Sequence, residues 1–333
     1  MNTPENILLI RLKSIGDVLF TLPAVHVVRE NFPAAKLHFL VSREHAPLLR
    51  GFAEIDETLP LDRAVYRSGN LRAAVSSSFE LLRVLRRKQF SLAIDFQGYG
   101  ETELLAWWSG APRRWGCVYH PPRGWLYTRG VRLSYQSHPA DNHLALLRES
   151  GLRPGEIRNE FVVPPEALAG AGQFFAANHL EAARSTLFLQ PFTSSPLKNW
   201  PLENFLALAR YWQARGWQVL FGGGPSDRGA LAPAQAAGYP VSAGVPLLVT
   251  AGLMKLSTLV AGGDTGLLHL AVALGKRVVM LMGSNAPGRT HPFGHPDWAV
   301  TPAEGETVSK IQVAAVIAAS TRAFSEPAGS VFC

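Results

Sequence analysis

The chain has 333 residues, of which 47% are hydrophobic and 17% are charged, as is typical of a globular protein with one large or two ordinary domains. No apolar run approaches the roughly 18 residues that a membrane-spanning helix needs, and the N-terminal residues lack the basic region of a secretory signal peptide. Cys117 and Cys333 form neither a disulfide framework nor part of a metal-ligand set, so we expect a protein of the reducing cytosol.

The net charge of +7 lies mostly in the first half of the chain. Residues 1–160 carry 21 Lys and Arg against 16 acidic residues, and residues 161–333 carry 11 against 9. Arginine predominates, and its planar guanidinium suits phosphate and carboxylate groups. An anionic partner or a membrane surface that contacts the first half is one interpretation, and a solvated basic face without a partner is the other. No basic helix with interleaved aromatic residues is present, which argues against a nucleic-acid partner.

Short apolar runs alternate with helical spacing along the first half. The first run, residues 7–10, is continuous, as buried strands of parallel sheets are, and Asp17 opens the helix that follows it. Residues 119–137 hold prolines, glycines and aromatic residues without periodicity, which predicts a functional or flexible loop. The other elements expected here are strands at 37–41, 92–95 and 114–118, an extended segment at 54–61, and helices at 46–49, 71–90, 103–108 and 142–149.

A second alternating series follows the domain break expected at Pro164 and Pro165. After a connecting helix at 166–179, the expected elements are strands at 186–190, 217–221, 259–261 and 277–282, and helices at 201–215, 247–257, 267–274 and 312–324. Two such series predict an α/β fold with two doubly wound parallel sheets.

Residues 259–275 are expected to form a strand, a glycine turn and a helix in that order. Gly262 and Gly263 end the predicted strand, and residues 264–266 make the turn. The free N–H groups at the start of the helix then offer an anion site, and His269, about one turn further on, faces the same end. The alternative interpretation is an ordinary strand–helix turn with a capping residue and a packed histidine.

Ligands of open parallel sheets bind at the carboxyl ends of the strands. Neither half holds a G-x-G-x-x-G turn or a P-loop, so nicotinamide binding and ATP hydrolysis lack their usual signatures. Lys198 could place a point charge near a diphosphate, and a solvated loop lysine is the alternative. Asp17, in the turn of an otherwise apolar strand–helix unit, is the best candidate base, with a helix N-cap as its alternative role. Asp95 is a second strand-end carboxylate.

Several spaced motifs carry a resemblance to a known family. Ile7-Leu-Leu-Ile-Arg-Leu-Lys-Ser-Ile-Gly-Asp-Val-Leu-Phe-Thr-Leu-Pro-Ala24 resembles the opening of the bacterial heptosyltransferases of glycosyltransferase family nine. Ile94-Asp-Phe-Gln-Gly98 is similar to another strand of that family. Later parts of the sequence resemble the later motifs of the family in the same order, at Thr193, Lys198-Asn-Trp-Pro201, Asp227 and Asp264-Thr-Gly-Leu-Leu-His269. The likeness extends from about residue 7 to residue 320.

The resemblance implies a GT-B architecture, in which two Rossmann-like domains face each other across a cleft. An N-terminal domain of residues 1–165 would bind the acceptor, and a C-terminal domain of residues 166–325 the nucleotide sugar, with the final helix able to pack back on the first domain. The implied reaction is transfer of L-glycero-D-manno-heptose from ADP-heptose to the inner core of lipopolysaccharide, with inversion and without a metal or other cofactor. The implied partners are the anionic lipid A-core acceptor and the cytoplasmic face of the inner membrane, where the enzyme would be peripheral.

The resemblance also implies a role for each matching residue. Asp17 would be the general base on the acceptor hydroxyl, and Lys198 would stabilise the leaving diphosphate. The donor-binding residues would be Thr193, Ser194, Asp227, Asp264, Thr265, Gly266 and His269. The acceptor-side residues would be Arg11, Lys13, Asp95, Gln97 and Arg123.

One loop departs from the family pattern, since Gly283-Ser-Asn-Ala-Pro287 lacks the acid of the Gly-Pro-Thr-Asp-Pro sequence that the family often shows. Three alternatives stand beside the heptosyltransferase. One is a family member that moves another nucleotide sugar to a different glycan or to a protein. Another is a Rossmann-type oxidoreductase or epimerase, and the last is a non-catalytic binder of anionic lipid.

Overall fold

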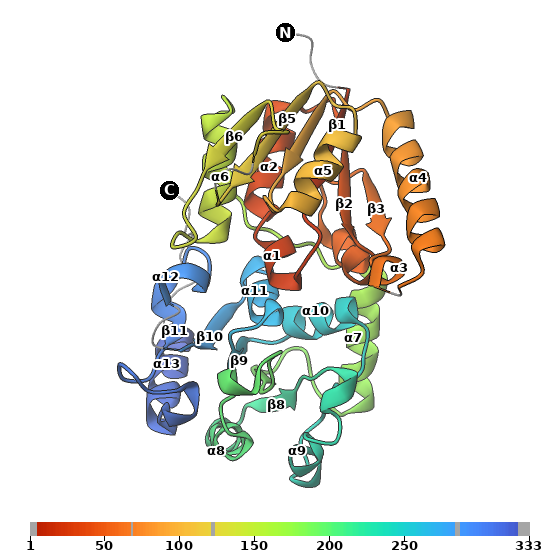
Figure 1. Cartoon of the computed structure of the whole chain (residues 1–333). Coiled ribbons are helices and arrows are strands. Elements are labelled where there is room, and N and C mark those ends of the chain that lie inside the picture. The colour runs from red at the N-terminus through yellow and green to blue at the C-terminus, as the bar shows by residue number, and fades with distance from the viewer. Residues whose placement is uncertain (1–4, 68, 121–123, 284–286, 326–333) are drawn as a thin grey trace. The chain divides into compact units, whose positions relative to one another are not determined.

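The computed structural model describes residues 5–67, 69–120, 124–283 and 287–325. The chain forms two compact units, with the boundary between Asn159 and Glu160, and each unit is built on a parallel β-sheet (Figure 1). The predicted α/β class is confirmed. None of the helices in these ranges combines the length and hydrophobicity needed to cross a bilayer.

The first unit contains a six-stranded parallel sheet in the order β3-β2-β1-β4-β5-β6. Strand β1 lies in the middle, and Ile7 pairs with Leu37 on one side and with Leu92 on the other. This strand order is that of a Rossmann fold, whose direction of winding reverses between the first and fourth strands. The strands are β1 (Asn6–Ile10), β2 (Lys36–Ser42), β3 (Glu57–Leu61), β4 (Leu92–Asp95), β5 (Arg113–Val118) and β6 (Arg129–Arg132).

The first unit differs from the prediction at the helix after β1, at residues 43–51 and in the loop at 119–137, and the short helix Ala64–Arg67 was not predicted. The single helix expected from Asp17 onward is two helices, separated at Phe20 and Thr21, where the Thr21 hydroxyl donates to the Val18 carbonyl over 2.7 Å. The segment expected at 46–49 is part of the 3₁₀ helix η1 (Arg43–Gly51), and the loop expected at 119–137 contains strand β6. The α-helices are α1 (Ile15–Leu19), α2 (Leu22–Asn31), α3 (Ala64–Arg67), α4 (Leu71–Arg87), α5 (Gly100–Trp108) and α6 (Pro139–Glu149).

The second unit contains a five-stranded parallel sheet in the order β11-β10-β9-β7-β8. Numbered within the unit, this is the flavodoxin-like order 2-1-3-4-5, in which the winding reverses between β7 and β9. Gly262 and Gly263 lie inside β9 and pair with Met280 and Leu281, so the prediction that they end the strand is wrong. The strands are β7 (Thr186–Gln190), β8 (Gln218–Phe221), β9 (Leu259–Gly263), β10 (Arg277–Leu281) and β11 (Ala299–Val300).

Helices cover this second sheet. Helix α7 packs on α10, and the last helix, α13, packs on α8, β9 and β10 of the same unit. The core on that side is rich in tryptophan, and the indole N–H of Trp200 donates to the Ile311 carbonyl over 2.8 Å. The helices are α7 (Pro165–Ala177), α8 (Leu202–Gln213), α9 (Ala232–Ala236), α10 (Leu247–Leu256), α11 (Gly266–Ala273), α12 (Pro287–Thr290) and α13 (Val313–Ser325), with short 3₁₀ segments η2 (Pro196–Lys198), η3 (Pro225–Asp227), η4 (Pro296–Trp298) and η5 (Val308–Lys310).

Close contact between β7 and β9 requires glycine at position 262. A Cβ atom there would lie 2.4 Å from the Gln190 carbonyl oxygen, which belongs to the backbone and cannot yield. We expect Gly262→Ala to lower the free energy of unfolding by about 2 kcal/mol, because overpacking of a buried strand forces the backbone apart. Denaturant unfolding measures the change. Gly172→Ala is the control, because a Cβ at Gly172 in helix α7 meets nothing within 4 Å and should leave stability unchanged or raise it.

Candidate functional site

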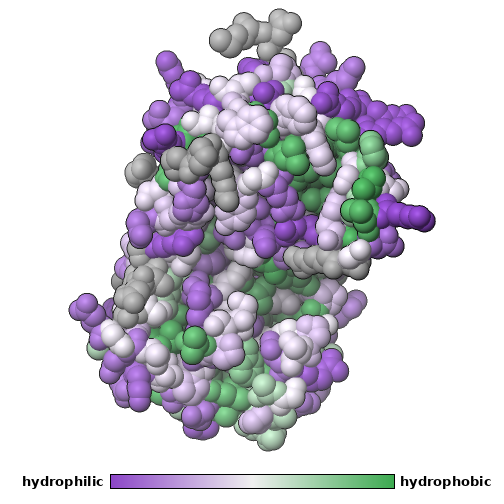
Figure 2. Space-filling model, in the orientation of Figure 1, coloured by the Kyte–Doolittle hydropathy of each residue, from purple (hydrophilic) through white to green (hydrophobic). Residues whose placement is uncertain are grey.

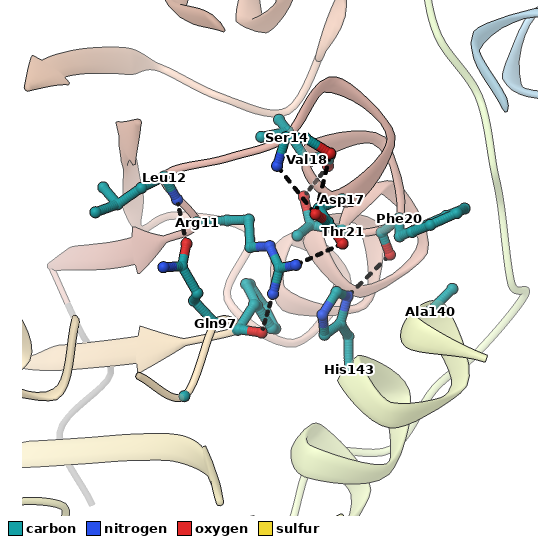
Figure 3. Close-up of polar contacts among 12 residues, drawn as sticks. Arg11, Leu12, Ser14, Asp17, Val18, Phe20, Thr21, Gln97, Ala140 and His143 are labelled. Carbon is teal, nitrogen blue, oxygen red and sulfur yellow. Dashed lines mark hydrogen bonds and ion pairs between the residues drawn. The ribbon is translucent and has the colours of Figure 1, made fainter. Parts of the chain in front are cut away.

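Arg11 and Asp17 form an ion pair directly after β1, at the point where the winding of the first sheet reverses (Figure 3). Arg11 Nη2 lies 2.6 Å from Asp17 Oδ1, and Arg11 Nη1 donates to the Phe96 carbonyl over 3.0 Å, just beyond β4. The guanidinium is buried, whereas 35% of the Asp17 side chain is exposed. A buried cation is stable only when it is paired. The pairing with Arg11 therefore holds the Asp17 carboxylate at a fixed place near the carboxyl ends of the strands.

Asp17 also belongs to a capping box. Ser14 is the N-cap of α1, and both its backbone N–H and its hydroxyl donate to Asp17 Oδ2, over 3.0 Å and 3.1 Å. The N-cap position that the sequence offered for Asp17 is therefore occupied by Ser14, and Asp17 is the third residue of the helix. Because its two oxygens have different partners, the carboxylate serves both the helix end and Arg11.

The surroundings of Asp17 set its protonation state. Burial raises the pKa of the carboxyl, but the Arg11 guanidinium and the hydrogen bonds from Ser14 outweigh burial and hold the pKa below its ordinary value. Asp17 is consequently ionised at neutral pH. A carboxylate in this state can accept a proton, as a general base must.

Two histidines near Asp17 were not singled out from the sequence. His143 of α6 is fully buried; its Nδ1 lies 3.0 Å from the Phe20 carbonyl oxygen, and burial lowers its pKa to about 3. Burial also lowers the pKa of His45 in η1. The charge of Arg63 lowers this pKa further, and the charge of Asp17 raises it. Both residues come from segments far from Asp17 in sequence, and no spacing rule connects them to it.

The other residues expected on the acceptor side lie in different settings. Gln97 is buried, and its Oε1 accepts a hydrogen bond from the Leu12 N–H over 2.9 Å, which braces the turn that carries Arg11. Asp95 is fully buried, accepts from the Tyr127 hydroxyl over 2.6 Å and from the Gln97 N–H over 2.8 Å, and has its pKa raised by burial. This network favours a structural role for Asp95. Lys13 is exposed, and Arg123 lies outside the described residues.

In the second unit, Lys198, Asp264 and His269 come together at the carboxyl ends of β7 and β9. Lys198 Nζ donates to Asp264 Oδ2 over 2.7 Å, and His269 Nε2 lies 3.4 Å from Asp264 Oδ1. Asp264 is nearly buried, whereas 49% of the Lys198 side chain is exposed. Burial raises the pKa of Asp264, but hydrogen bonds and charge from His269 and Lys198 bring it below its ordinary value. The cluster thus presents an exposed cation anchored by a buried anion.

The start of α11 lies beside this cluster. Thr265 is the N-cap, and its hydroxyl accepts from the Leu267 N–H over 3.2 Å, while Gly266 is the first helical residue. Thr193 packs closely enough that a Cβ on Gly263 would meet its methyl group at 2.6 Å. The backbone of Thr193 is held by Asn199, and its hydroxyl donates to the Ser195 carbonyl over 2.8 Å. Ser194 is exposed in the same loop.

Asp227 follows β8, the edge strand next to β7. Its Oδ2 accepts from the Gly224 N–H over 2.8 Å, which closes the glycine-rich turn after β8. Asp227 therefore lies at the carboxyl ends of the strands, as Lys198, Asp264 and His269 do. It follows the strand two places from β9 in the order β9-β7-β8. Within the described residues, no three His, Cys, Asp or Glu side chains form a group that could hold a metal ion. Of the loop at 283–287, residues 284–286 lie outside the described part.

Comparison with known proteins identifies the family. The model of glycosyltransferase family 9 (heptosyltransferase) matches residues 78–313. The chain belongs to glycosyltransferase family 9. It is 23% identical to the lipopolysaccharide core heptosyltransferase OpsX of Haemophilus influenzae, over 90% of this chain and 84% of OpsX. It is 22% identical to lipopolysaccharide heptosyltransferase 1 of Escherichia coli K12, over 86% of the chain and 91% of that protein.

Solved structures confirm the GT-B fold of this family 9 enzyme. A family 9 glycosyltransferase from Veillonella parvula matches with a TM-score of 0.85 at 22% identity, covering 96% of this chain and 97% of that one. The E. coli heptosyltransferase WaaC with ADP matches with a TM-score of 0.79 at 21% identity, covering 96% and 99%. The protein is thus a glycosyltransferase of the GT-B type.

The ion pairs of Asp264 predict a pH-dependent contribution to stability. We expect Asp264→Asn to lower the free energy of unfolding at neutral pH by about 1–2 kcal/mol, because charge-assisted hydrogen bonds to Lys198 and His269 are lost. The folded-state pKa of Asp264 is lowered, so the wild-type advantage is full above the unfolded value of about 3.9 and disappears as the pH falls through the folded-state pKa.

Urea unfolding of both proteins between neutral and acidic pH measures this difference. Asp297→Asn, at an exposed aspartate of the same unit, is the matched control and should change stability by less than about 0.5 kcal/mol. A wild-type advantage that grows as the pH falls would contradict the assignment.

Proposed function

We propose that this protein is an inverting heptosyltransferase that transfers L-glycero-D-manno-heptose from ADP-heptose to the inner core of lipopolysaccharide. Family 9 membership supports the reaction class, and curated relatives matched over most of the chain are named lipopolysaccharide heptosyltransferases. The observation that carries the catalytic proposal is the partly exposed Asp17 carboxylate, held by buried Arg11 at the reversal point of the first sheet.

On the donor side, Lys198 and the start of α11 would receive the diphosphate. The Lys198 ammonium has two further N–H donors beyond its bond to Asp264, and its side chain is half exposed. Because they lie at the start of α11, the N–H groups of Thr265 and Gly266 have no partner within the helix, and they add partial positive charge. Asp264 positions Lys198, and together with His269, Thr193, Ser194 and Asp227 it contributes to the walls of the donor site. The WaaC structures that this chain resembles contain ADP and ADP-2-deoxy-2-fluoro heptose, which supports an ADP-sugar as donor.

On the acceptor side, Asp17 accepts the proton of the acceptor hydroxyl as its oxygen bonds to the anomeric carbon of heptose. The bond between that carbon and the diphosphate oxygen breaks on the opposite face, which inverts the configuration, and ADP leaves with the electron pair. Lys198 and the α11 N-terminus stabilise the charge that develops on the diphosphate. Arg11 keeps Asp17 ionised and fixes its position, since misplacement of a base costs rate steeply.

The basic first half fits an anionic acceptor. Its excess of cations matches the phosphates of a lipid A-core molecule, which would be met at the cytoplasmic face of the inner membrane. The decisive assay mixes the protein with ADP-heptose and heptose-deficient lipopolysaccharide and measures ADP release. Acceptor-dependent release supports the proposal. Release with another ADP-sugar or acceptor only would identify a different transferase of this family, and no acceptor-dependent release with any ADP-sugar would refute both.

Replacement of Asp17 tests the base. We expect Asp17→Asn to lower kcat by about 10²-fold or more while ADP affinity stays nearly unchanged, because an amide accepts no proton. Steady-state kinetics and calorimetric ADP titration measure the two quantities. Ser14→Ala is the matched control: it removes one capping hydrogen bond of Asp17 and lowers stability by about 1 kcal/mol, yet it keeps the carboxylate and should keep turnover. Equal loss of turnover in both variants would assign Asp17 to capping alone.

Removal of divalent metal tests the role of Lys198. If Lys198 and the α11 N-terminus carry the charge of the leaving diphosphate, EDTA should change kcat by less than about twofold, whereas Lys198→Ala should lower it by about 10²-fold or more. The ADP-release assay with and without EDTA and added Mg²⁺ measures this. A strict metal requirement would be inconsistent with the role given to Lys198.

A further inference from the structure

Helix α4 (Leu71–Arg87) presents an apolar face to solvent. Of its 17 residues, Leu85 is the buried one. Leu71, Val75, Phe79 and Leu82, here called the α4 ridge, follow the spacing i, i+4, i+8 and i+11 and so share one side of the helix. Leu71 is 76% exposed and Phe79 is 68% exposed. Figure 2 shows the resulting hydrophobic strip over α4, at the right of the view. A contiguous apolar strip of this kind, unlike single exposed apolar residues, marks an interaction surface.

The α4 ridge borders a shallow groove. Together with Trp108 of α5, its side chains line an open hollow of about 400 Å³ whose walls are almost wholly apolar. The side chain of Arg86 is fixed at this groove, because its Nε donates to the Trp108 carbonyl over 2.8 Å. A cation is therefore held beside Trp108, one of the residues that line the apolar groove.

Further arginines lie beside the α4 ridge. Arg72, Arg83 and Arg87 are exposed, and their spacing puts them on the sector of the helix next to the ridge, on the side of Phe79. Glu80 is the one acidic residue in the helix. An exposed apolar stripe flanked by arginines is the pattern of helices that lie in the interface of an anionic membrane, with the apolar side chains among the acyl chains and the cations at the headgroups.

We propose that the α4 ridge and its arginines dock the protein on the surface of a bilayer that contains anionic phospholipids. Charge complementarity selects this occupant. In a symmetric pair of copies each surface patch meets itself, so the arginines of one α4 would face those of the other. This inference extends the proposed function, since a lipid-borne acceptor lies at a membrane, but the docking surface contains no residue of the candidate site.

Vesicle binding tests the proposal without donor or acceptor. The full-length protein is sedimented with vesicles of phosphatidylglycerol and phosphatidylethanolamine, and with phosphatidylcholine vesicles for comparison. We expect preferential binding to the anionic vesicles that weakens strongly at about 0.5 M salt, where the screening length is short. The double variant Leu71→Ser with Phe79→Ser should bind at least about 10-fold more weakly at either salt concentration. The double variant Arg83→Gln with Arg87→Gln should lose the preference for anionic vesicles.

Matched controls replace exposed residues elsewhere. Val162→Ser with Leu168→Ser, and Arg153→Gln with Arg322→Gln, remove the same kinds of side chain from residues outside α4 and should bind as the wild type does. Circular dichroism and thermal unfolding confirm that every variant is folded. Absence of wild-type binding to anionic vesicles, or equal binding by the α4 variants and the controls, would refute the proposal. A concentration-dependent dimer that Leu71→Ser with Phe79→Ser abolishes would assign the ridge to a second copy instead.

Failure of this proposal is distinguishable from failure of the proposed function. A deacylated, water-soluble core acceptor removes the need for a membrane, so the α4 variants should release ADP with it at the wild-type rate. Their loss of rate should appear only with acceptor embedded in anionic vesicles. Vesicle binding without any transferase activity would leave the docking surface in place and reject the reaction.

Discussion

The pairing of the buried Arg11 guanidinium is the interaction on which the first unit's site depends. Arg11 leaves β1 at the centre of the sheet, and its charge is tolerated there because Asp17 and the Phe96 carbonyl both accept from it. This pairing ties the end of β1, the end of β4 and the start of α1 into one rigid group. It also keeps Asp17 ionised while part of its carboxylate remains open to solvent. A single buried cation thus sets the place and the protonation state of the proposed base.

The second unit also contains an ion pair between a buried and an exposed group, but with the charges reversed. Here the nearly buried group is the anion, Asp264, and the exposed partner is Lys198. The pair lies after β9 and β7, where the winding of the sheet reverses and the two following segments diverge. Close packing at Gly262 and Gly263 brings these strand ends near enough for the contact. A donor diphosphate placed there would meet an oriented cation rather than a mobile one, which is the preorganisation that charge stabilisation requires.

Most helices and strands could be predicted because apolar periodicity is a local property. The failures have physical reasons. Strand β6 has an exposed, arginine-rich sequence at the sheet edge, so its pairing with β5 and not its hydrophobicity makes it a strand. The helix expected from Asp17 breaks because the Thr21 hydroxyl donates a hydrogen bond to the Val18 carbonyl. Gly262 and Gly263 suggest a turn by propensity, but their lack of side chains is what lets β7 and β9 approach. Tertiary contact overrides local preference in each case.

The sequence by itself determined the α/β class, the two alternating series and the identity of the chemically capable residues, because these follow from composition, periodicity and spaced motifs along the chain. Only the tertiary structure decided which of those residues act together. Arg11 pairs with Asp17, Lys198 with Asp264 across 66 positions, and Asp95 turns inward to Tyr127. His143 comes near Asp17 although it lies on a different helix. Such encounters arise from the order of strands in a sheet, and strand order is a property of the folded chain that no local pattern encodes.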